Sequence, residues 1–367
     1  MQEPILSYFY NGKHYYSKFA VCEAALLDGV HRKFLVDQIK PTVFKDHNYF
    51  NNYDWTKEPQ QSWYEMCVQR AHELRQNHKY LALAYSGGSD CAFILDIFIK
   101  NNIPLDEIYT VLADPFADKI LPEGIDSSCW EIYNHAIPYM KYIEKEYDLR
   151  NTKFIIHNNY KDSITGQFQK GLLTNYNHTT HYSATGNAHY QVVVDYKAQD
   201  KFILNGGLEP NVYFDGRYHM DVWDTDSMSL LSHSNYIPFY LDKNKPEMHA
   251  KQCHLLMKYF KQYGYSHRRN NYENYHKAQI SSTRAWLYDF SQSPYFIKNV
   301  AKNEDAKGPK SSIFVLRKAQ AFVKALRYFN VENWQKPIRD YYLEPKIKGI
   351  HLYDLPIGFP ITRQYLE

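Results

Sequence analysis

The segment of residues 80–100 constrains the fold of this chain more than any other. It opens with a short apolar run, Y-L-A-L-A-Y, turns through S-G-G-S-D, and continues with apolar residues at helical spacing. The two glycines, Gly87 and Gly88, allow a sharp turn and a close approach of the backbone to a ligand. The first N–H groups of the following helix and its dipole favour negative charge. A strand, a tight loop and a helix in this order therefore predict a phosphate site.

The residues that follow this segment predict an open α/β sheet. Apolar runs of strand length recur at residues 107–113, 153–157 and 202–204. A segment of helical spacing lies between the first two runs; it follows an expected capping box of Ser128 and Glu131, and Pro138 should kink it. Alternating strands and helices predict a mainly parallel sheet with helices on both faces, and ligands of such sheets bind beyond the carboxyl ends of the strands.

The residues before the glycine turn carry two further local signals. Asn11-Gly12 lies between aromatic runs and predicts a hairpin, and a helix is expected over residues 18–28. Ser62 and Glu65 form an S-x-x-E capping box ahead of apolar residues on one helical face. We expect this second helix to deliver the chain into the first strand of the sheet.

Composition excludes several classes of protein. The chain has 367 residues, a net charge of +3 and no apolar run of 18 residues, so neither a membrane span nor a dedicated nucleic-acid binder is indicated. Five cysteines lie far apart and form no C-x-x-C pair, which argues against a disulfide framework and a thiolate zinc site. They are Cys22, Cys67, Cys91, Cys129 and Cys253. With no secretory leader visible, we expect a cytoplasmic protein.

The glycine turn differs from the two commonest nucleotide motifs. The chain contains neither G-x-x-x-x-G-K-[ST] nor G-x-G-x-x-G. Residues 86–90, S-G-G-S-D, instead closely resemble the S-G-G-x-D-S signature of the PP-loop ATP pyrophosphatases, which include asparagine synthetase, NAD synthetase and several tRNA-modifying enzymes. Position six departs from that signature, because Cys91 stands in place of serine. The alternative interpretation is an ordinary strand-to-helix turn.

The resemblance implies a set of ATP contacts. The loop would hold the pyrophosphate of ATP through Ser86, Gly87, Gly88 and Ser89, and Asp90 would help to hold Mg²⁺. Cys91 would keep a backbone N–H contact but lose a hydroxyl donor, a role that Ser89 could take over. Backbone groups at the ends of the first two strands would surround adenine: Leu83, Ala84, Tyr85, Leu112 and Ala113, with Asp114 just beyond.

A second glycine loop follows the apolar run at residues 202–204. Residues 205–211, N-G-G-L-E-P-N, resemble more loosely the second ATP loop of asparagine-synthetase-like enzymes. The resemblance implies that Gly206 and Gly207 lie near the nucleotide and that Glu209 is a second metal ligand or orients the incoming substrate. Asp215 is a weaker candidate, and a solvated β-turn is the alternative interpretation.

The later part of the chain offers cations and a possible lid. Residues 158–190 are irregular and could cover the site, and their His178 and His181 are better read as surface residues than as a metal pair. Between residues 258 and 284 six basic residues interleaved with tyrosines could contact phosphates of ATP or of a nucleic acid, or form a solvated helix face. A cation to neutralise pyrophosphate is expected from Lys310, with Lys307 and Arg317 as alternatives.

The domain organisation that follows has three parts. We expect an N-terminal arm over residues 1–60 and an ATP-binding α/β domain over residues 61–220. Helical spacing at residues 248–263 and 313–329 predicts a mainly helical C-terminal region over residues 221–367, which would shape the acceptor pocket.

The function implied is adenylation. An oxygen of a small-molecule or nucleobase acceptor would attack ATP, and ammonia, an amine or another nucleophile would then displace AMP, with Asp90, Glu209 and Lys310 as the catalytic groups. Asparagine synthetase itself is not expected, because Gln2 stands where its glutaminase domain has cysteine. Two alternatives stay open: sulfur transfer to a nucleobase through Cys129 or Cys253, and a non-catalytic nucleotide sensor or scaffold.

Overall fold

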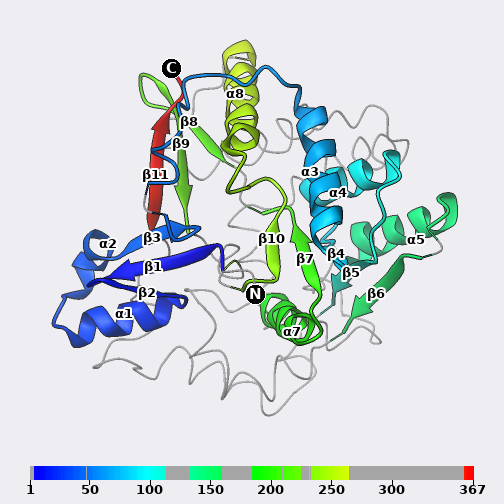
Figure 1. Ribbon diagram of the computed structural model, residues 1–367, viewed down its shortest axis with the longest axis horizontal. Helices are drawn as coiled ribbons and strands as arrows, with labels where there is room; N and C mark the ends of the chain where they lie inside the picture. The colour runs from blue at the N-terminus through cyan, green and yellow to red at the C-terminus, as the bar shows by residue number, and fades with distance from the viewer. Residues whose placement is uncertain are drawn as a thin grey trace, which may run out of the picture.

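A computed structural model describes nine stretches of the chain. They are residues 4–46, 48–112, 132–149, 151–158, 184–207, 210–224, 231, 233–263 and 359–367. Within them the chain forms a five-stranded sheet, two three-stranded sheets and the helices that pack on them (Figure 1).

The five-stranded sheet is parallel throughout and confirms the α/β class. Its strand order is β10-β7-β4-β5-β6. In chain order the bounds are β4 Leu81–Ala84, β5 Glu107–Val111, β6 Lys153–His157, β7 Phe202–Asn205 and β10 Tyr236–Pro238. The first strand lies in the middle, the next two extend the sheet to one side and the last two to the other. The direction of winding therefore reverses between β4 and β7, and ligands of doubly wound sheets bind at such a reversal.

Helices cover both faces of this sheet. Leu81, Leu83 and Ile108 point to one face, where they pack on α3 (Trp63–Asn77), α4 (Ser89–Lys100) and α5 (Ile137–Glu146). Ala82 and Tyr109 point to the other face, which α7 (Ala184–Ala198) covers. This alternation is the period of two that a strand imposes, and strands buried on both faces read as continuous apolar runs.

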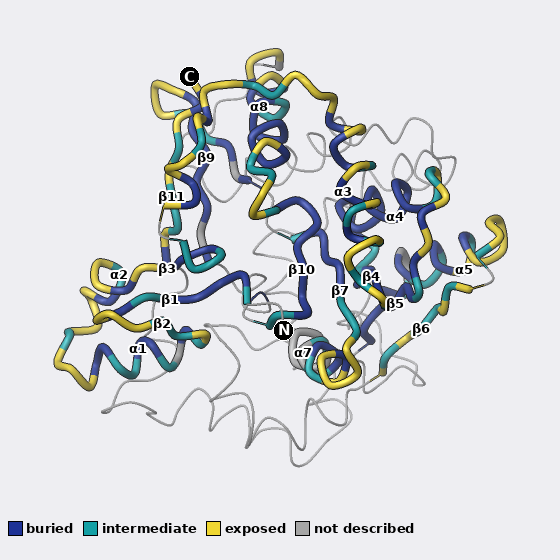
Figure 2. The backbone as a smooth tube through the Cα atoms, viewed as in Figure 1, coloured by how far each residue is buried: buried dark blue, intermediate teal, exposed yellow. Residues whose placement is uncertain are grey.

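The two edges of the sheet differ in burial. All three residues of β10 are buried, whereas β6 mixes exposed and half-buried residues (Figure 2). The sequence did not reveal β10, because three residues are too short for a strand pattern. β10 lies in the region of residues 221–367, where we expected mainly helices. One strand of the parallel sheet therefore comes from the expected C-terminal region. The division into three domains stays a prediction.

The N-terminal arm forms its own small sheet. It has the order β2-β1-β3, with β1 Leu6–Tyr10, β2 Lys13–Tyr15 and β3 Lys40–Val43. The predicted hairpin is confirmed: Asn11 and Gly12 both have positive φ, 46° and 76°, as the Asn-Gly turn of a hairpin requires. The predicted helix is also present as α1 (Lys18–Leu27), and η1 (Arg32–Phe34) and α2 (Leu35–Gln38) follow it.

A second antiparallel sheet joins the middle of the chain to its last residues. It has the order β11-β9-β8, with β8 Asn211–Phe214, β9 Tyr218–Trp223 and β11 Pro360–Tyr365. In Figure 1 it stands beside the N-terminal sheet, on the far side of β10 from α3 and α4. The predicted helix near residue 248 is confirmed as α8 (Pro246–Tyr263). A membrane span would need a longer and more apolar helix than any in the described part of the chain.

Pro138 lies where two kinds of helix join. It is the second residue of α5, and a π-helical turn, η2 (Ile132–Ala136), directly precedes that helix. The backbone of Ala136 at the junction is also helical, with φ −66° and ψ −55°. A change from π-helical to α-helical geometry at a proline is a common setting for a kink, and the kink itself stays a prediction. The expected capping box of Ser128 and Glu131 lies outside the described residues, as do residues 313–329.

The capping box at the start of α3 is formed as predicted. Ser62 Oγ accepts from the Glu65 N–H at 3.3 Å, and Glu65 Oε2 accepts from the Ser62 N–H at 3.2 Å. We expect Ser62→Ala to lower the free energy of unfolding by about 1 kcal/mol. The exposed neighbour substitution Gln61→Ala should change it by less than about 0.5 kcal/mol in the same urea titration. Equal effects would show that the cap does not stabilise α3.

Candidate functional site

The glycine turn connects β4 to α4 at the reversal point of the sheet. Gly87 has a φ of +80°, a left-handed conformation that glycine adopts without strain. Gly88 is the N-cap residue of α4 and supplies no side-chain cap, and its carbonyl accepts the first helical bond, from the Ala92 N–H at 3.0 Å. The end of a helix without a side-chain cap suits an anion, because the first N–H groups and the dipole point toward it.

The second glycine loop packs directly against the first. A Cβ atom on Gly206 would lie 2.9 Å from the Cβ of Asp90, 3.2 Å from its backbone carbon and 3.2 Å from the Cys91 nitrogen. Only a residue without a side chain fits this contact. The strand order explains why the loops meet, since β4 and β7 are neighbours. The structure thus brings Asp90 and Gly206 together, two residues that the sequence placed in separate motifs.

Asn205 shapes the second loop and was not predicted as a site residue. Its Oδ1 accepts from the Gly207 N–H at 2.8 Å, and its backbone oxygen accepts from the Phe239 N–H at 3.0 Å. Its Nδ2 is buried and has no hydrogen-bond partner among the residues that the structure describes. An asparagine before two glycines gave no signal in the sequence, because its role depends on the fold of the loop.

The cysteine that replaces the signature serine is buried beside the loop. Cys91 Sγ lies 3.9 Å from Ser86 Oγ, within reach of a weak hydrogen bond to sulfur. The sulfur therefore contacts the first serine of the motif. Of Ser89 the structure describes the backbone alone, so its predicted takeover of the hydroxyl role stays a prediction.

The strand ends expected around adenine are largely buried. Leu83, Ala84, Tyr85 and Leu112 are all buried. The Tyr85 N–H donates to the Tyr109 carbonyl and the Leu112 N–H to the His157 carbonyl, both at 2.7 Å. Those two N–H groups extend the sheet and are not available for adenine. The adenine contacts stay a prediction for the remaining backbone groups.

Several predicted residues lie outside the described part of the chain. They are Ala113, Asp114, Cys129, His178, His181, Glu209, Arg268, Arg269, Lys277, Arg284, Lys307, Lys310 and Arg317. The weaker candidate Asp215 lies at the turn between β8 and β9, where its carboxylate contacts Arg363 and His219, each at 3.4 Å.

The described lysines of the basic strip pair within the chain. On α8, Lys258 Nζ lies 2.6 Å from Glu58 Oε2, and Lys261 Nζ lies 2.5 Å from Glu367 Oε2. Both contacts hold α8 to distant segments. A contact of this strip with nucleic acid stays a prediction.

The cysteine expected for sulfur transfer is poorly placed for it. Cys253 is fully buried on α8, its Sγ lies 3.4 Å from Met220 Sδ, and burial raises the pKa of its thiol. A persulfide carrier must be accessible and thiolate-like, so Cys253 does not fit that role.

A second polar cluster lies between the sheet and α7. Glu107 is fully buried on β5 and accepts from the hydroxyls of Tyr80, at 2.8 Å, and Tyr196. His157 Nε2 lies 2.9 Å from the Tyr196 oxygen. Nearby, His189 bonds to the Tyr109 hydroxyl at 2.8 Å, and burial lowers its pKa to about 4. Each carboxylate oxygen of Glu107 thus accepts a hydroxyl hydrogen bond, and we assign the cluster to stabilising the packing of α7.

The described side chains form no dedicated metal cage. Across the described ranges, no three histidine, cysteine, aspartate or glutamate side chains gather as such a cage would require. Asp90 supplies one carboxylate at the glycine loop. Mg²⁺ bound to a nucleotide usually needs only one or two carboxylates, since phosphates and water complete its shell. A site of that kind fits the residues present.

Comparisons with known proteins leave the family open. No family model matches the chain, and no curated protein sequence matches it. Among solved structures, the NH3-dependent NAD synthetase from Campylobacter jejuni subsp. jejuni NCTC 11168, in complex with the nitrate ion, aligns over 75% of this chain and 96% of its own, with 12% identity and a TM-score of 0.30. A likeness at that level identifies neither the family nor the activity.

Proposed function

We propose that this protein is an ATP-dependent enzyme that forms AMP and pyrophosphate while adenylating an oxygen of its acceptor. The observation that carries the proposal is the contact between the two glycine loops, where Gly206 packs on Asp90 at the reversal point of a doubly wound sheet. The S-G-G-S-D motif suggests that the ligand is the pyrophosphate part of ATP. Its position at the reversal point of the sheet, where ligands of doubly wound sheets bind, supports this interpretation.

The residues of the loop suit the pyrophosphate part of ATP. Gly87 and Gly88 leave the approach to α4 free of Cβ atoms, and the helix end offers N–H groups and a positive dipole. The Asp90 carboxylate would hold Mg²⁺ together with phosphate oxygens. That ion would neutralise the negative charge that develops on the departing pyrophosphate.

The reaction then needs no nucleophile from the protein. A carboxylate or carbonyl oxygen of the acceptor forms a bond to the α-phosphorus, and the bond from that phosphorus to the oxygen bridging the α- and β-phosphates breaks. Pyrophosphate leaves with this electron pair. Ammonia, an amine or another nucleophile next attacks the carbon that carries the adenylated oxygen and gives up a proton, and AMP departs with the electron pair of the broken C–O bond. The loop orients the triphosphate and stabilises its negative charge. Orientation and preorganised dipoles of this kind lower the activation barrier more than most other effects in enzymes.

The products of ATP turnover test this proposal. The full chain is incubated with α-labelled ATP, Mg²⁺ and pooled metabolites or nucleic acid, and the nucleotide products are separated. We expect AMP and pyrophosphate, and we expect Asp90→Asn to lower AMP formation at least about 100-fold by removing the metal-binding charge. The exposed α2 residue substitution Asp37→Asn is the control and should retain full activity.

Other products would distinguish the alternatives. Release of ADP and phosphate would contradict the pyrophosphatase mechanism. ATP binding without turnover in every acceptor pool would favour the sensor or scaffold. Full activity in Asp90→Asn would show that the site assignment is wrong.

A further inference from the structure

The segment that follows β10 contacts both glycine loops. Residues 239–242 begin the connection between β10 and α8, which runs over residues 239–245, and they were not expected at the site. The Phe239 N–H donates to the Asn205 carbonyl at 3.0 Å, which ties the segment to the second loop. One residue on, the Tyr240 hydroxyl donates to the carbonyl of Asp90 at 3.0 Å, which ties it to the first turn of α4.

Tyr240 reaches Asp90 from a closely packed position. Its side chain is fully buried, and its ring stacks on Trp63 of α3 with centroids 5.7 Å apart. The backbone carbon of Asp90, whose carbonyl accepts this hydrogen bond, would lie 3.2 Å from a Cβ atom placed on Gly206. The hydroxyl therefore fixes the part of α4 against which the second loop is seated.

A buried arginine holds this segment in place. On α3, Arg70 is largely buried, and its guanidinium donates to the carbonyls of Phe239, at 3.3 Å, and Leu241, at 3.5 Å, and to the carboxylate of Asp242. From the N-terminal arm, the Tyr49 hydroxyl donates to the Asp242 carbonyl at 2.7 Å. Contacts from two directions leave the segment little freedom to shift.

We propose that Tyr240 is a positioning residue of the anion site. Through its hydrogen bond to the Asp90 carbonyl, it sets the first turn of α4 against Gly206, so that both loops present one preformed surface to the pyrophosphate group. The inference rests on the proposed function. Preorganisation raises affinity because the loops need no ordering when the ligand binds.

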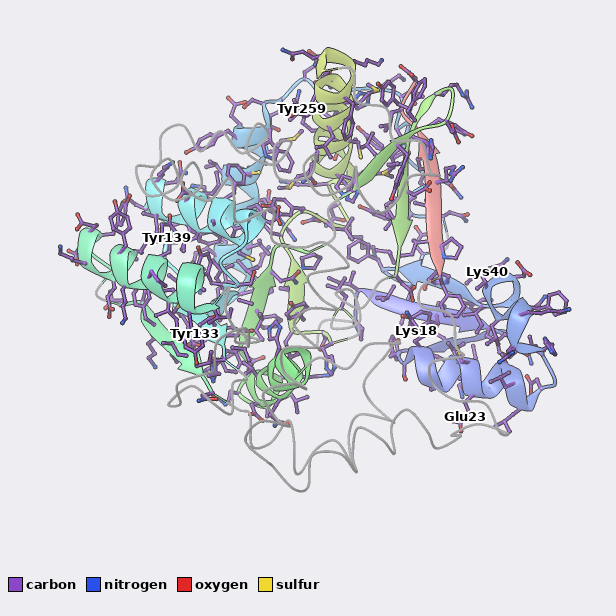
Figure 3. All side chains as sticks on the ribbon, turned by 180° about the vertical axis from the view of Figure 1, so that it is seen from behind. Lys18, Glu23, Lys40, Tyr133, Tyr139 and Tyr259 are labelled. Carbon is purple, nitrogen blue, oxygen red and sulfur yellow. The ribbon has the colours of Figure 1, made fainter. Side chains whose placement is uncertain are left out.

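The test compares two substitutions that each remove one buried hydroxyl. Tyr240→Phe keeps the ring and its stacking. The matched control is Tyr139→Phe: the buried Tyr139, labelled in Figure 3, donates to Asp96 Oδ1 at 2.9 Å and belongs to α5. Binding of inorganic pyrophosphate with Mg²⁺ is measured by calorimetry, and amide hydrogen exchange is followed in peptides covering residues 86–92.

We expect Tyr240→Phe to weaken pyrophosphate binding by about threefold to tenfold and to speed exchange in residues 86–92. Both substitutions should lower the melting temperature by a similar amount, because each removes one buried hydroxyl. Tyr139→Phe should leave pyrophosphate affinity and the exchange of residues 86–92 unchanged. Equal affinity and exchange in wild type and Tyr240→Phe would overturn the positioning role while leaving the proposed function intact. If the wild-type chain bound neither pyrophosphate nor ATP, the proposed function would fall and this role with it. Unchanged hydrogen exchange of residues 86–92 in Tyr240→Phe would count against the positioning role, whether or not the wild-type chain binds pyrophosphate.

Discussion

Replacing Gly206 by alanine is expected to force the two glycine loops apart and to abolish nucleotide binding. The new Cβ would approach Asp90 Cβ to 2.9 Å and two backbone atoms of α4 to 3.2 Å. None of these atoms is the end of a flexible side chain, so backbone must move. Overpacking of this kind costs about 1–3 kcal/mol of stability. The displacement would also move the start of α4, where the pyrophosphate group is expected to bind.

The neighbouring glycine supplies a matched control. A Cβ on Gly207 would lie 2.8 Å from Asn205 Oδ1, the end of a side chain that can rotate. We expect Gly207→Ala to be milder, with a loss of stability of about 1 kcal/mol and measurable ATP binding. Thermal unfolding and calorimetric titration with Mg-ATP check both variants. Full ATP affinity in Gly206→Ala would show that the contact between the loops is unrelated to nucleotide binding.

Asp224→Asn is expected to destabilise the protein by about 3–5 kcal/mol, because it leaves a buried lysine without a counter-charge. Lys18 Nζ lies 3.2 Å from Asp224 Oδ2, and both side chains are almost completely buried. Asp224 also accepts from the Phe359 N–H and returns a backbone bond to the Phe359 carbonyl at 3.0 Å. Lys18, labelled in Figure 3, thus lies where α1, β9 and the C-terminal segment meet.

Replacing the partner residue, Lys18→Met, should lower the free energy of unfolding by less than Asp224→Asn does, and the loss should depend on pH. Burial raises the pKa of Asp224 to about 6, above an unfolded value near 3.8, so the folded state binds this proton more tightly than the unfolded state does. This proton-linked part of the stability is complete below about 3.8 and is lost as the pH rises through 6, whereas the ion pair with Lys18 needs the ionised carboxylate. In Lys18→Met the same carboxyl can take up a proton. We expect that variant to lose roughly 1–2 kcal/mol at pH 7 and less at pH 5.

Urea unfolding of the wild type, the two single variants and the double variant at pH 5 and pH 7 measures the coupling. Lys18→Met/Asp224→Asn should be more stable than Asp224→Asn alone, because it no longer buries an unpaired charge. If the double variant were instead as unstable as the sum of the single variants, and Lys18→Met did not respond to pH, the buried pair would not stabilise this junction.

Local signals in the sequence predicted most of the elements that frame the site. The S-x-x-E box, the Asn-Gly turn and the strand, loop and helix around Gly87 each involve residues close in sequence, so the backbone geometry follows from the residues themselves. The π-helical turn before α5 had no such local signal, because its residues also fit ordinary helical spacing.

Contacts between distant residues could not be predicted from the sequence. The packing of Gly206 on Asp90 follows from the pairing of β4 with β7, and strand order is a tertiary property. Tyr240 lies 150 residues from the carbonyl that accepts its hydrogen bond, and it follows a strand of three residues that has no sequence pattern. The motif thus predicted which residues would bind a phosphate. The fold shows which distant residues, Gly206 and Tyr240, hold that loop in place.

A crystal structure with a non-hydrolysable ATP analogue and Mg²⁺ tests the central claim most directly. We expect the pyrophosphate part of the analogue to lie at the start of α4, within hydrogen-bonding distance of the backbone N–H groups of residues 87–90 and beside Gly206. The metal should contact the Asp90 carboxylate. An analogue bound at saturating concentration elsewhere on the protein, with nothing at the start of α4, would contradict the assignment of this site.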